Sequence, residues 1–207
     1  MAEKDMMSMT VAEFIAATAD KTPTPGGGSV AGVVGALAVA LGEMSLVFTR
    51  GKKKFAEHEE FYAHLAGRLA KARGMFQLLV SDDVAAYSLY QDATRREEGP
   101  DKAAAVQLAL AAAIDVPRQA AKLALAVMED LLVLAPRCNP YLISDLTAGA
   151  ALAAATVRLC DYNVRVNVPQ VADRAAAEEI RAASAGDLMA AEKLLADIEQ
   201  SAKSLLP

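Results

Sequence analysis

The chain has 207 residues, of which 54% are apolar and 23% are charged, so it contains enough apolar side chains for a buried core. Its net charge of −5 gives no general attraction to phosphate backbones, and we expect no nucleic-acid partner. Cys138 and Cys160 are far apart and have no paired histidines, so neither a metal site nor a disulfide framework is expected. The N-terminus lacks the apolar core of a secretory signal, and we expect a cytoplasmic protein.

Hydrophobic spacing predicts helix along nearly the whole chain. Thr10 and Glu13 match a capping box at the start of a short helix that ends near Asp20. After a loop, residues 30–49 form an apolar stretch that would be about 30 Å long as a helix. That length suits a membrane span, but three glycines, Glu43 and the lack of a second such segment favour the central helix of a bundle. We therefore expect no membrane association.

Two long helices are predicted next. An amphipathic pattern covers residues 55–95, and the stretch 97–100 then breaks it. An alanine-rich helix follows from a cap at Asp101 to about Leu134, with a bend at Pro117. Further helices are predicted over residues 145–163 and, after an interruption at 166–169, along the tail to Leu205.

These elements predict an all-α fold in which residues 1–207 form a single domain, a bundle of five to six helices, two of them long. The many alanine and glycine residues predict close approach of the helix axes. The helix over residues 30–49 is apolar on all sides except at Glu43, so its surface needs cover all round. We expect a second copy of the chain to provide part of that cover, in a homodimer.

The loop Lys21–Ser29 holds two prolines and three glycines immediately before the apolar helix. Gly26, Gly28 and Ala31 match the spacing of a dinucleotide-binding fingerprint, but no strand precedes them, and no lysine follows as in a phosphate-binding loop. The glycines allow backbone N–H groups to face a ligand, and Ser29 is a candidate cap for the next helix. Its N-terminal end favours an anionic or carbonyl-rich ligand, and a purely structural capped turn is the alternative.

Further motifs follow this loop in order. The set comprises Thr22-Pro-Thr-Pro-Gly-Gly-Gly-Ser29 with Gly51-Lys-Lys-Lys-Phe55, then Asp82-Asp-Val-Ala-Ala-Tyr87, Ile114-Asp-Val-Pro117, Ile143-Ser-Asp145 and Asn163-Val-Arg-Val-Asn167. In combination they resemble the formiminotetrahydrofolate cyclodeaminase and methenyltetrahydrofolate cyclohydrolase family. The resemblance implies an all-helical dimer that acts on reduced folates, with neither a metal nor a redox cofactor. One branch closes 5-formimino-tetrahydrofolate to the 5,10-methenyl form with loss of ammonia, and the other hydrolyses the methenyl form to 10-formyl-tetrahydrofolate.

The resemblance implies three catalytic candidates, of which the first is Asp83. This residue lies in mid-helix near Ala86 and Tyr87, where burial would raise the pKa of a carboxyl group and suit it to general acid/base catalysis. Asp82 points about 100° away around the helix and is expected to face solvent. The second candidate, Asp145, would hydrogen-bond the pterin ring or relay a proton, although Asp145 or Ser144 is equally an ordinary helix cap.

The third catalytic candidate is Lys53, which would neutralise folate carboxylates or hold the reacting oxygen. Its neighbours Lys52 and Lys54 are alternatives, and cations at this position also stabilise the end of the preceding helix. The other substrate-binding candidates come from the glycine loop, the Ser-Asp motif and a helix end that we expect to be unwound: Pro25, Gly26, Gly27, Gly28, Ser29, Ser144, Asn163, Arg165 and Asn167. Asn139, in the preceding loop, is a weaker candidate.

Two features concern the choice between the two reactions. Residues 137–143 depart from the family pattern before Ser144, and Pro140 would reshape that wall of the pocket. We expect a free-standing enzyme without a formiminotransferase domain, which favours a methenyltetrahydrofolate cyclohydrolase over the cyclodeaminase. A non-catalytic bundle that binds folate or scaffolds a complex is the second alternative. Cys138 is expected to be more exposed than Cys160, and without a paired base it is not expected to be a nucleophile.

Overall fold

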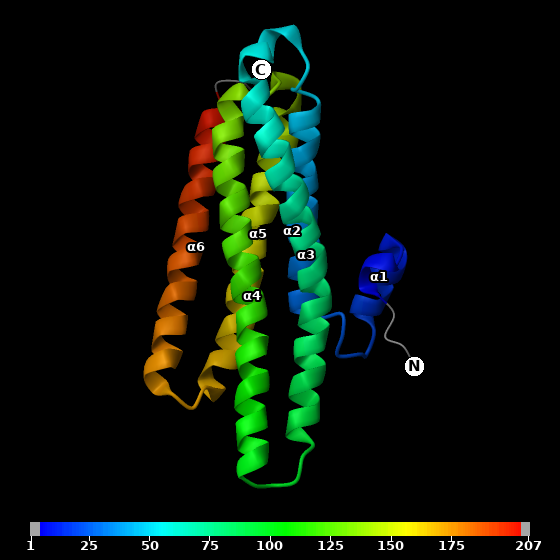
Figure 1. The fold of residues 1–207 in the computed structure, drawn as a ribbon, viewed down its shortest axis with the longest axis vertical. Coiled ribbons are helices and arrows are strands. Elements are labelled where there is room, and N and C mark those ends of the chain that lie inside the picture. Colours follow the sequence, from blue (N-terminus) through cyan, green and yellow to red (C-terminus); the bar gives the residue numbers. More distant parts are fainter. Residues whose placement is uncertain (1–4, 204–207) are drawn as a thin grey trace.

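The computed structural model describes residues 5–203, and within that range the fold is all-α, as predicted (Figure 1). The α-helices are α1 (Val11–Ala19), α2 (Gly27–Val47), α3 (Glu59–Thr94), α4 (Pro100–Leu134), α5 (Ile143–Asn167) and α6 (Arg174–Lys203). Short 3-10 helices lie at Met6–Ser8, Lys53–His58, Ala135–Arg137, Pro140–Leu142 and Val168–Gln170. The two longest helices, α3 and α4, have 36 and 35 residues.

Helix α2 packs against both α3 and α5. A Cβ atom on Gly35 of α2 would lie 2.4 Å from the Phe76 ring of α3. A Cβ atom on Gly149 of α5 would lie 2.9 Å from the Ala38 carbonyl oxygen of α2. Any larger side chain at these positions would push the helices apart, so the glycines allow the close approach that the composition predicts.

The starts of α2 and α4 differ from the prediction. Helix α2 begins at Gly27 with Gly26 as its N-cap, so Ser29 lies inside the first turn and is not the cap. Helix α4 begins at Pro100, so Asp101 also lies inside a first turn and is not the cap. Proline suits the first helical position because its φ angle is already helical and its missing N–H would have no partner there.

Helix α5 is longer than predicted. It begins at Ile143, which places Ser144 and Asp145 in its first turn, and neither caps the helix. It stays helical as far as Asn167, so the predicted unwinding before that residue is absent. The α-helix then gives way to the 3-10 helix Val168–Gln170, where Pro169 has no N–H to continue the α-helical hydrogen bonds.

Helix α1 lies apart from the bundle, to the right of α3 in Figure 1. Its predicted capping box is present: the Thr10 hydroxyl accepts the Glu13 N–H at 3.2 Å, and the Glu13 carboxylate accepts the Thr10 N–H at 2.7 Å. No residue of α1 is buried, and Val11 and Ile15 are 78% and 62% exposed. The helix thus presents an uncovered apolar face.

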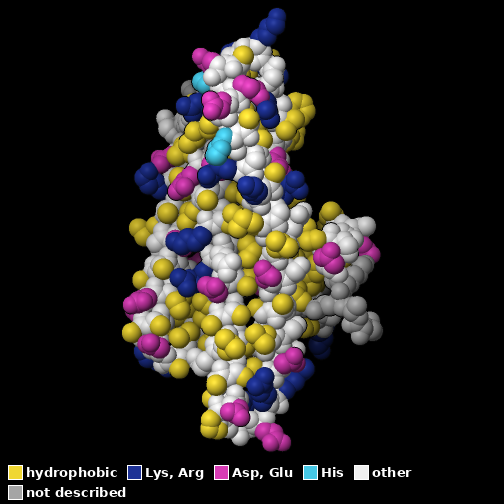
Figure 2. Space-filling view, in the orientation of Figure 1, with side chains coloured by type: hydrophobic (Ala, Val, Ile, Leu, Met, Phe, Trp, Pro, Cys, Tyr) yellow, Lys and Arg dark blue, Asp and Glu magenta, His cyan; other side chains and the backbone are white. Residues whose placement is uncertain are grey.

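One side of α2 is also uncovered, where Leu37, Met44, Val47 and Phe48 are between 41% and 69% exposed. Among the described residues, the stretches Gly27–Val47 and Pro140–Gln170 are long and apolar enough to cross a membrane, so the expected lack of a second such segment is wrong. In each stretch about half of the apolar window is buried in the bundle, 50% and 44% respectively. Elsewhere, the face in Figure 2 mixes hydrophobic and charged side chains. A continuous apolar stripe such as that on α2 is typical of a surface that another apolar surface covers.

Candidate active site

Asp83 of α3 meets the N-terminus of α2. The buried Ser29 hydroxyl donates a hydrogen bond of 2.7 Å to Asp83 Oδ2, and the Ser29 backbone N–H also donates to this carboxylate. Burial raises the pKa of Asp83, while the two hydrogen bonds from Ser29 oppose part of that rise because they favour the charged form. The carboxylate also replaces the side-chain cap that Gly26 does not supply to α2.

The glycine loop makes room for this carboxylate. A Cβ atom on Gly28 would lie 1.9 Å from Asp83 Oδ1, and one on Gly27 would lie 3.5 Å from the Asn163 side-chain amide. In the same loop, the peptide bond between Thr24 and the buried Pro25 is cis. The glycine motif therefore seats the N-terminus of α2 against Asp83 and Asn163.

A cavity of about 370 Å³ opens beside Asp83, between α3, α4 and α5. Among the described residues that line it, Asp83 is the one charged side chain. Hydroxyl, amide and apolar groups make up the rest of a lining that consists of Asp83, Ala86, Tyr87, Tyr90, Ala113, Asn163, Val166, Asn167 and Gln170. With one carboxyl and no cation, the cavity suits a ligand that is cationic or rich in N–H donors.

Asn167 takes the place of a hydrogen bond that Pro117 removes from α4. Because proline has no N–H, the carbonyl of Ala113 four residues earlier loses its helical partner. Asn167 Nδ2 donates to that carbonyl at 3.3 Å and to the Asn163 carbonyl at 3.1 Å, while Asn163 Nδ2 donates to the Leu159 carbonyl at 2.8 Å. Both amide nitrogens serve backbone carbonyls, which leaves the side-chain oxygens as the groups to accept hydrogen bonds from a ligand.

The lysines lie at the opposite end of α2. Lys52, Lys53 and Lys54 follow its C-terminus and are exposed. The 21 residues of α2 separate them from the Asp83 cavity by about 30 Å. Within one chain, Lys53 and Asp83 therefore lie at opposite ends of α2 and cannot act on the same reacting group.

Asp145 lies at the same end of α2 as the lysines. The loop before α5 is held there because Thr49 Oγ1 accepts the Asn139 N–H at 2.9 Å and Asn139 Nδ2 donates to the Phe48 carbonyl at 3.1 Å. Asn139 is buried in this structural role. Cys138 beside it is also buried, at 2% exposed against 1% for Cys160, so Cys138 is not the exposed cysteine that the sequence predicted. Asp145 is half-buried in the first turn of α5.

Arg165 is directed away from the cavity. Its Nε pairs at 2.7 Å with Oδ2 of the buried Asp161, whose other oxygen accepts the Ser184 hydroxyl of α6 at 2.8 Å. Because α5 stays helical here, two residues correspond to about 200° around the helix axis. Asn163 and Asn167 therefore lie at the cavity, while Arg165 lies toward α6.

Comparisons with known proteins agree with this arrangement of motifs. The profile of the formiminotransferase-cyclodeaminase family matches residues 10–185. The chain belongs to this family. A methenyltetrahydrofolate cyclohydrolase of Methylorubrum extorquens is 35% identical over 178 residues, which cover 82% of this chain and 84% of that protein.

Two further relatives bear the cyclodeaminase name. The formimidoyltransferase-cyclodeaminase of Gallus gallus is 28% identical over 176 residues, which cover 83% of this chain and 32% of that longer protein. The crystal structure of formiminotetrahydrofolate cyclodeaminase from Thermotoga maritima matches with a TM-score of 0.82 at 30% identity, covering 97% of this chain and 96% of that one. The resemblance inferred from the motifs is therefore confirmed.

In this member of the formiminotransferase-cyclodeaminase family, the site candidates taken from the motifs left out Tyr87, although it ends the Asp82–Tyr87 motif, and also Tyr90 and Gln170. Tyr87 and Tyr90 follow Asp83 by four and seven residues, so they share its face of α3. Gln170 reaches the same cavity from the 3-10 helix after α5, and its Oε1 accepts the Tyr90 hydroxyl at 2.6 Å. Helical spacing from Asp83 would have identified both tyrosines, whereas Gln170 depends on where the bundle places the 3-10 helix after α5.

Proposed function

We propose that this protein is a methenyltetrahydrofolate cyclohydrolase, which hydrolyses 5,10-methenyl-tetrahydrofolate to 10-formyl-tetrahydrofolate. The observation that carries the proposal is Asp83, a carboxyl of raised pKa that Ser29 holds at the edge of a cavity. The methenyl carbon of the substrate belongs to a cationic amidinium group, which a carboxylate attracts and side-chain amide oxygens tolerate. The 35% identity to a cyclohydrolase over most of both chains supports the same reaction.

Asp83 moves the protons in this proposal. Its carboxylate takes a proton from water as the water oxygen bonds to the methenyl carbon, which gives a neutral carbinolamine. The protonated acid then supplies a proton to N5 as the C–N5 bond breaks, and the carbinol hydroxyl loses its proton to solvent as the formyl group forms. One water is consumed and one proton is released, so the reaction balances with no metal or redox cofactor. A carboxyl of raised pKa suits a group that must both accept and donate a proton.

The cyclodeaminase reaction is the second candidate, because the Thermotoga maritima protein with a TM-score of 0.82 is named for it. There N10 attacks the formimino carbon, and protonation of the exocyclic nitrogen releases ammonia. The same carboxyl would take the proton from N10 and supply one to the departing nitrogen. The two reactions share the carbon between two nitrogens and differ in whether water or ammonia is exchanged at it.

The proposal includes a homodimer that joins through the exposed stripe of α2. That stripe consists of Leu37, Met44, Val47 and Phe48. We propose that a second copy of the chain, rather than a membrane, covers it. If the two α2 helices run antiparallel, the N-terminal end of each lies beside the C-terminal end of the other. The Asp83 cavity of one protomer then meets Lys53 and Asp145 of its partner, which supplies the cations that the folate carboxylates need.

We further propose a cytoplasmic location. Cys138 and Cys160 are both buried and free, which is consistent with a reducing compartment.

The two substrates separate the candidate functions. The purified protein should speed the loss of 5,10-methenyl-tetrahydrofolate absorbance well above the spontaneous rate, with 10-formyl-tetrahydrofolate as the product. Release of ammonia from 5-formimino-tetrahydrofolate, measured on the same sample, should be slower. Faster ammonia release would make the cyclodeaminase the main activity, and folded protein without either activity would leave a folate-binding or scaffold role.

A further inference from the structure

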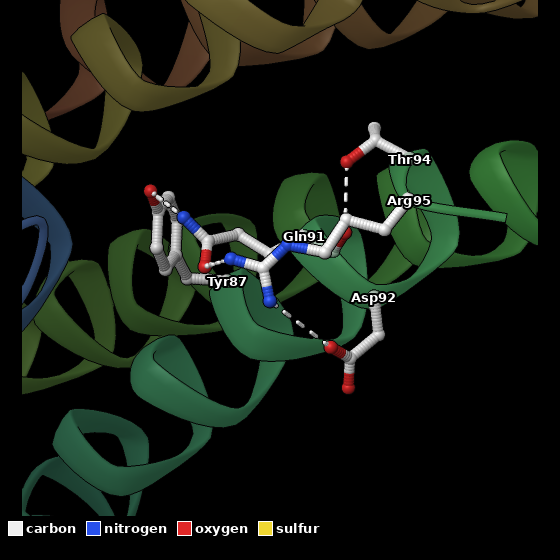
Figure 3. Close-up of polar contacts among 5 residues, drawn as sticks. All are labelled: Tyr87, Gln91, Asp92, Thr94 and Arg95. Carbon is white, nitrogen blue, oxygen red and sulfur yellow. Dashed lines mark hydrogen bonds and ion pairs between the residues drawn. The ribbon is translucent and has the colours of Figure 1, made fainter.

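A chain of polar contacts extends from Tyr87 along one face of α3 (Figure 3). Gln91 Nε2 donates to Tyr87 Oη at 2.5 Å, and Arg95 Nη2 donates to Gln91 Oε1 at 3.4 Å. The other guanidinium nitrogen, Arg95 Nη1, lies 3.9 Å from Asp92 Oδ1. The chain thus connects a surface ion pair to a tyrosine that lines the Asp83 cavity.

The charged end of the chain sets the orientation of Gln91. A guanidinium group has only donors, so the atom of Gln91 that faces Arg95 must be its oxygen, and the nitrogen must face Tyr87. The Tyr87 oxygen therefore receives a hydrogen bond from Gln91. Because a phenol carries a single hydrogen, that hydrogen is left to donate elsewhere, and the Tyr87 side chain lines the cavity.

Tyr87 lies one helical turn beyond Asp83, on the same side of α3. The cavity therefore combines a carboxyl that exchanges protons with a hydroxyl held as a donor. In the hydrolysis described above, the oxygen from water becomes first the carbinol oxygen and then the formyl oxygen. Both oxygens accept hydrogen bonds, whereas an ammonium leaving group has no lone pair to accept one.

We propose that the Tyr87 hydroxyl is a catalytic hydrogen-bond donor to the oxygen that water adds to the substrate, and that Gln91 and Arg95 are positioning residues that keep it a donor. This inference rests on the proposed cyclohydrolase function. Tyr87 keeps its proton throughout, and Asp83 carries out the proton transfers. The donor favours exchange of water over exchange of ammonia, since the water-derived oxygen accepts its hydrogen bond throughout, whereas the exocyclic nitrogen loses its lone pair when it is protonated to depart.

Substitutions at Gln91 test the direction of the hydrogen bond. In Gln91→Glu a carboxylate would accept the Tyr87 hydrogen and withdraw it from the cavity, so kcat should fall about tenfold or more, as in Tyr87→Phe. In Gln91→Leu the hydroxyl loses the hydrogen bond that positions it but can still donate, so kcat should fall by about threefold, less than in Gln91→Glu. The double variant Tyr87→Phe/Gln91→Glu should lose no more than Tyr87→Phe alone, because both remove the same donor. Tyr162→Phe, at a half-exposed tyrosine of α5, is the matched control and should leave kcat unchanged.

A binding measurement keeps this inference separate from the proposed function. By calorimetry, Tyr87→Phe should bind 5-formyl-tetrahydrofolate about tenfold more weakly than the wild type and bind tetrahydrofolate, which lacks the formyl oxygen, equally well. Wild-type protein without turnover would overturn the proposed function, and the calorimetry would still decide the role of Tyr87. Equal losses for Gln91→Glu and Gln91→Leu, or a Tyr87→Phe variant with wild-type kcat and formyl affinity, would overturn the inference.

Discussion

The Ser29 hydroxyl and the Asp83 carboxylate, 54 residues apart in the chain, share a hydrogen bond of 2.7 Å. This contact joins the first turn of α2 to the middle of α3 and serves two purposes. It caps a helix that begins with glycines, and it lowers the pKa of a carboxyl that burial raises. Substitutions at Ser29 or Asp83, measured for both activity and stability, can therefore distinguish the catalytic role of this contact from its role in folding.

Asp83→Asn should lower kcat about 100- to 1,000-fold, because the amide can neither accept nor supply a proton. The fold should persist, since the oxygen of the substituted amide can still accept the hydrogen bonds from Ser29. Stopped-flow measurement of methenyl absorbance, with circular dichroism to check the fold, provides the test. A folded variant with more than about a tenth of the wild-type kcat would exclude Asp83 as the acid/base.

The same substitution makes a prediction about stability. The pKa of Asp83 is raised in the folded protein, so its protonated form favours folding. That contribution is fully present below the ordinary aspartate pKa of about 3.9 and is lost as the pH rises through the raised value. The amide of the variant does not titrate, so residue 83 of the variant causes no loss of stability over this pH range. The melting temperature of Asp83→Asn relative to the wild type should therefore rise between acid and neutral pH, and a fall would contradict the cited direction of the shift.

Ser29→Ala should move the pH profile of catalysis. Removing the hydroxyl takes away a hydrogen bond that favours the charged carboxylate, so the pKa of Asp83 should rise further. If the carboxylate is the base, the acidic limb of kcat against pH should shift to higher pH while the plateau changes little. Ser81→Ala, at an exposed position of α3, is the matched control. If the acidic limb stays in place, it does not report the ionisation of Asp83.

Gly28→Ala should reduce both activity and stability. The new Cβ atom would lie 1.9 Å from Asp83 Oδ1, so either the carboxylate or the start of α2 must move. We expect kcat to fall at least tenfold and the free energy of unfolding to fall by about 1–3 kcal/mol. Gly186→Ala is the control: a Cβ atom there has no neighbour within 4 Å, and the change should stabilise α6 by about 0.5–1 kcal/mol. Chemical denaturation of the two variants should give shifts of opposite sign.

The sequence predicts the helices well because long hydrophobic periods dominate it. The errors lie at helix ends, where single residues decide: Pro100 rather than Asp101 begins α4, and Gly26 rather than Ser29 caps α2. Ser29 could not be assigned from its own neighbourhood, because its partner Asp83 comes from another helix. Local patterns cannot reveal a cap that is supplied by a distant residue.

In the candidate site, too, local motifs identified single residues but not which of them the fold brings together. Asp83 and the glycine loop were identified by motif, and the structure brings them together. Arg165 was grouped with Asn163 because an unwound helix was expected, yet α5 stays helical and directs Arg165 to Asp161. The separation of Lys53 from Asp83 follows from the length of α2, which the sequence did predict. What a single chain could not reveal is whether a second copy brings these two groups together.

Mixed dimers test whether the two ends of α2 from different protomers form one site. Asp83→Asn and Asp145→Asn should each abolish most activity alone. Co-expressed as a mixture with random pairing, half of the dimers are mixed, and each mixed dimer has one site with both aspartates intact if the site is shared. Activity should then return to about a quarter of the wild-type value.

The control pairs Asp83→Asn with Asn167→Leu, which alters the same cavity as Asp83. In a mixed dimer of these two variants every cavity carries one defect, so no activity should return. Leu37→Glu, in the exposed stripe of α2, should shift the protein toward monomer in size-exclusion chromatography and abolish the restored activity, because a buried carboxylate opposes association. Mixed dimers of Asp83→Asn and Asp145→Asn that stay inactive while remaining dimeric would contradict the shared site. Asp145 would then act at its own end of α2, apart from the Asp83 cavity.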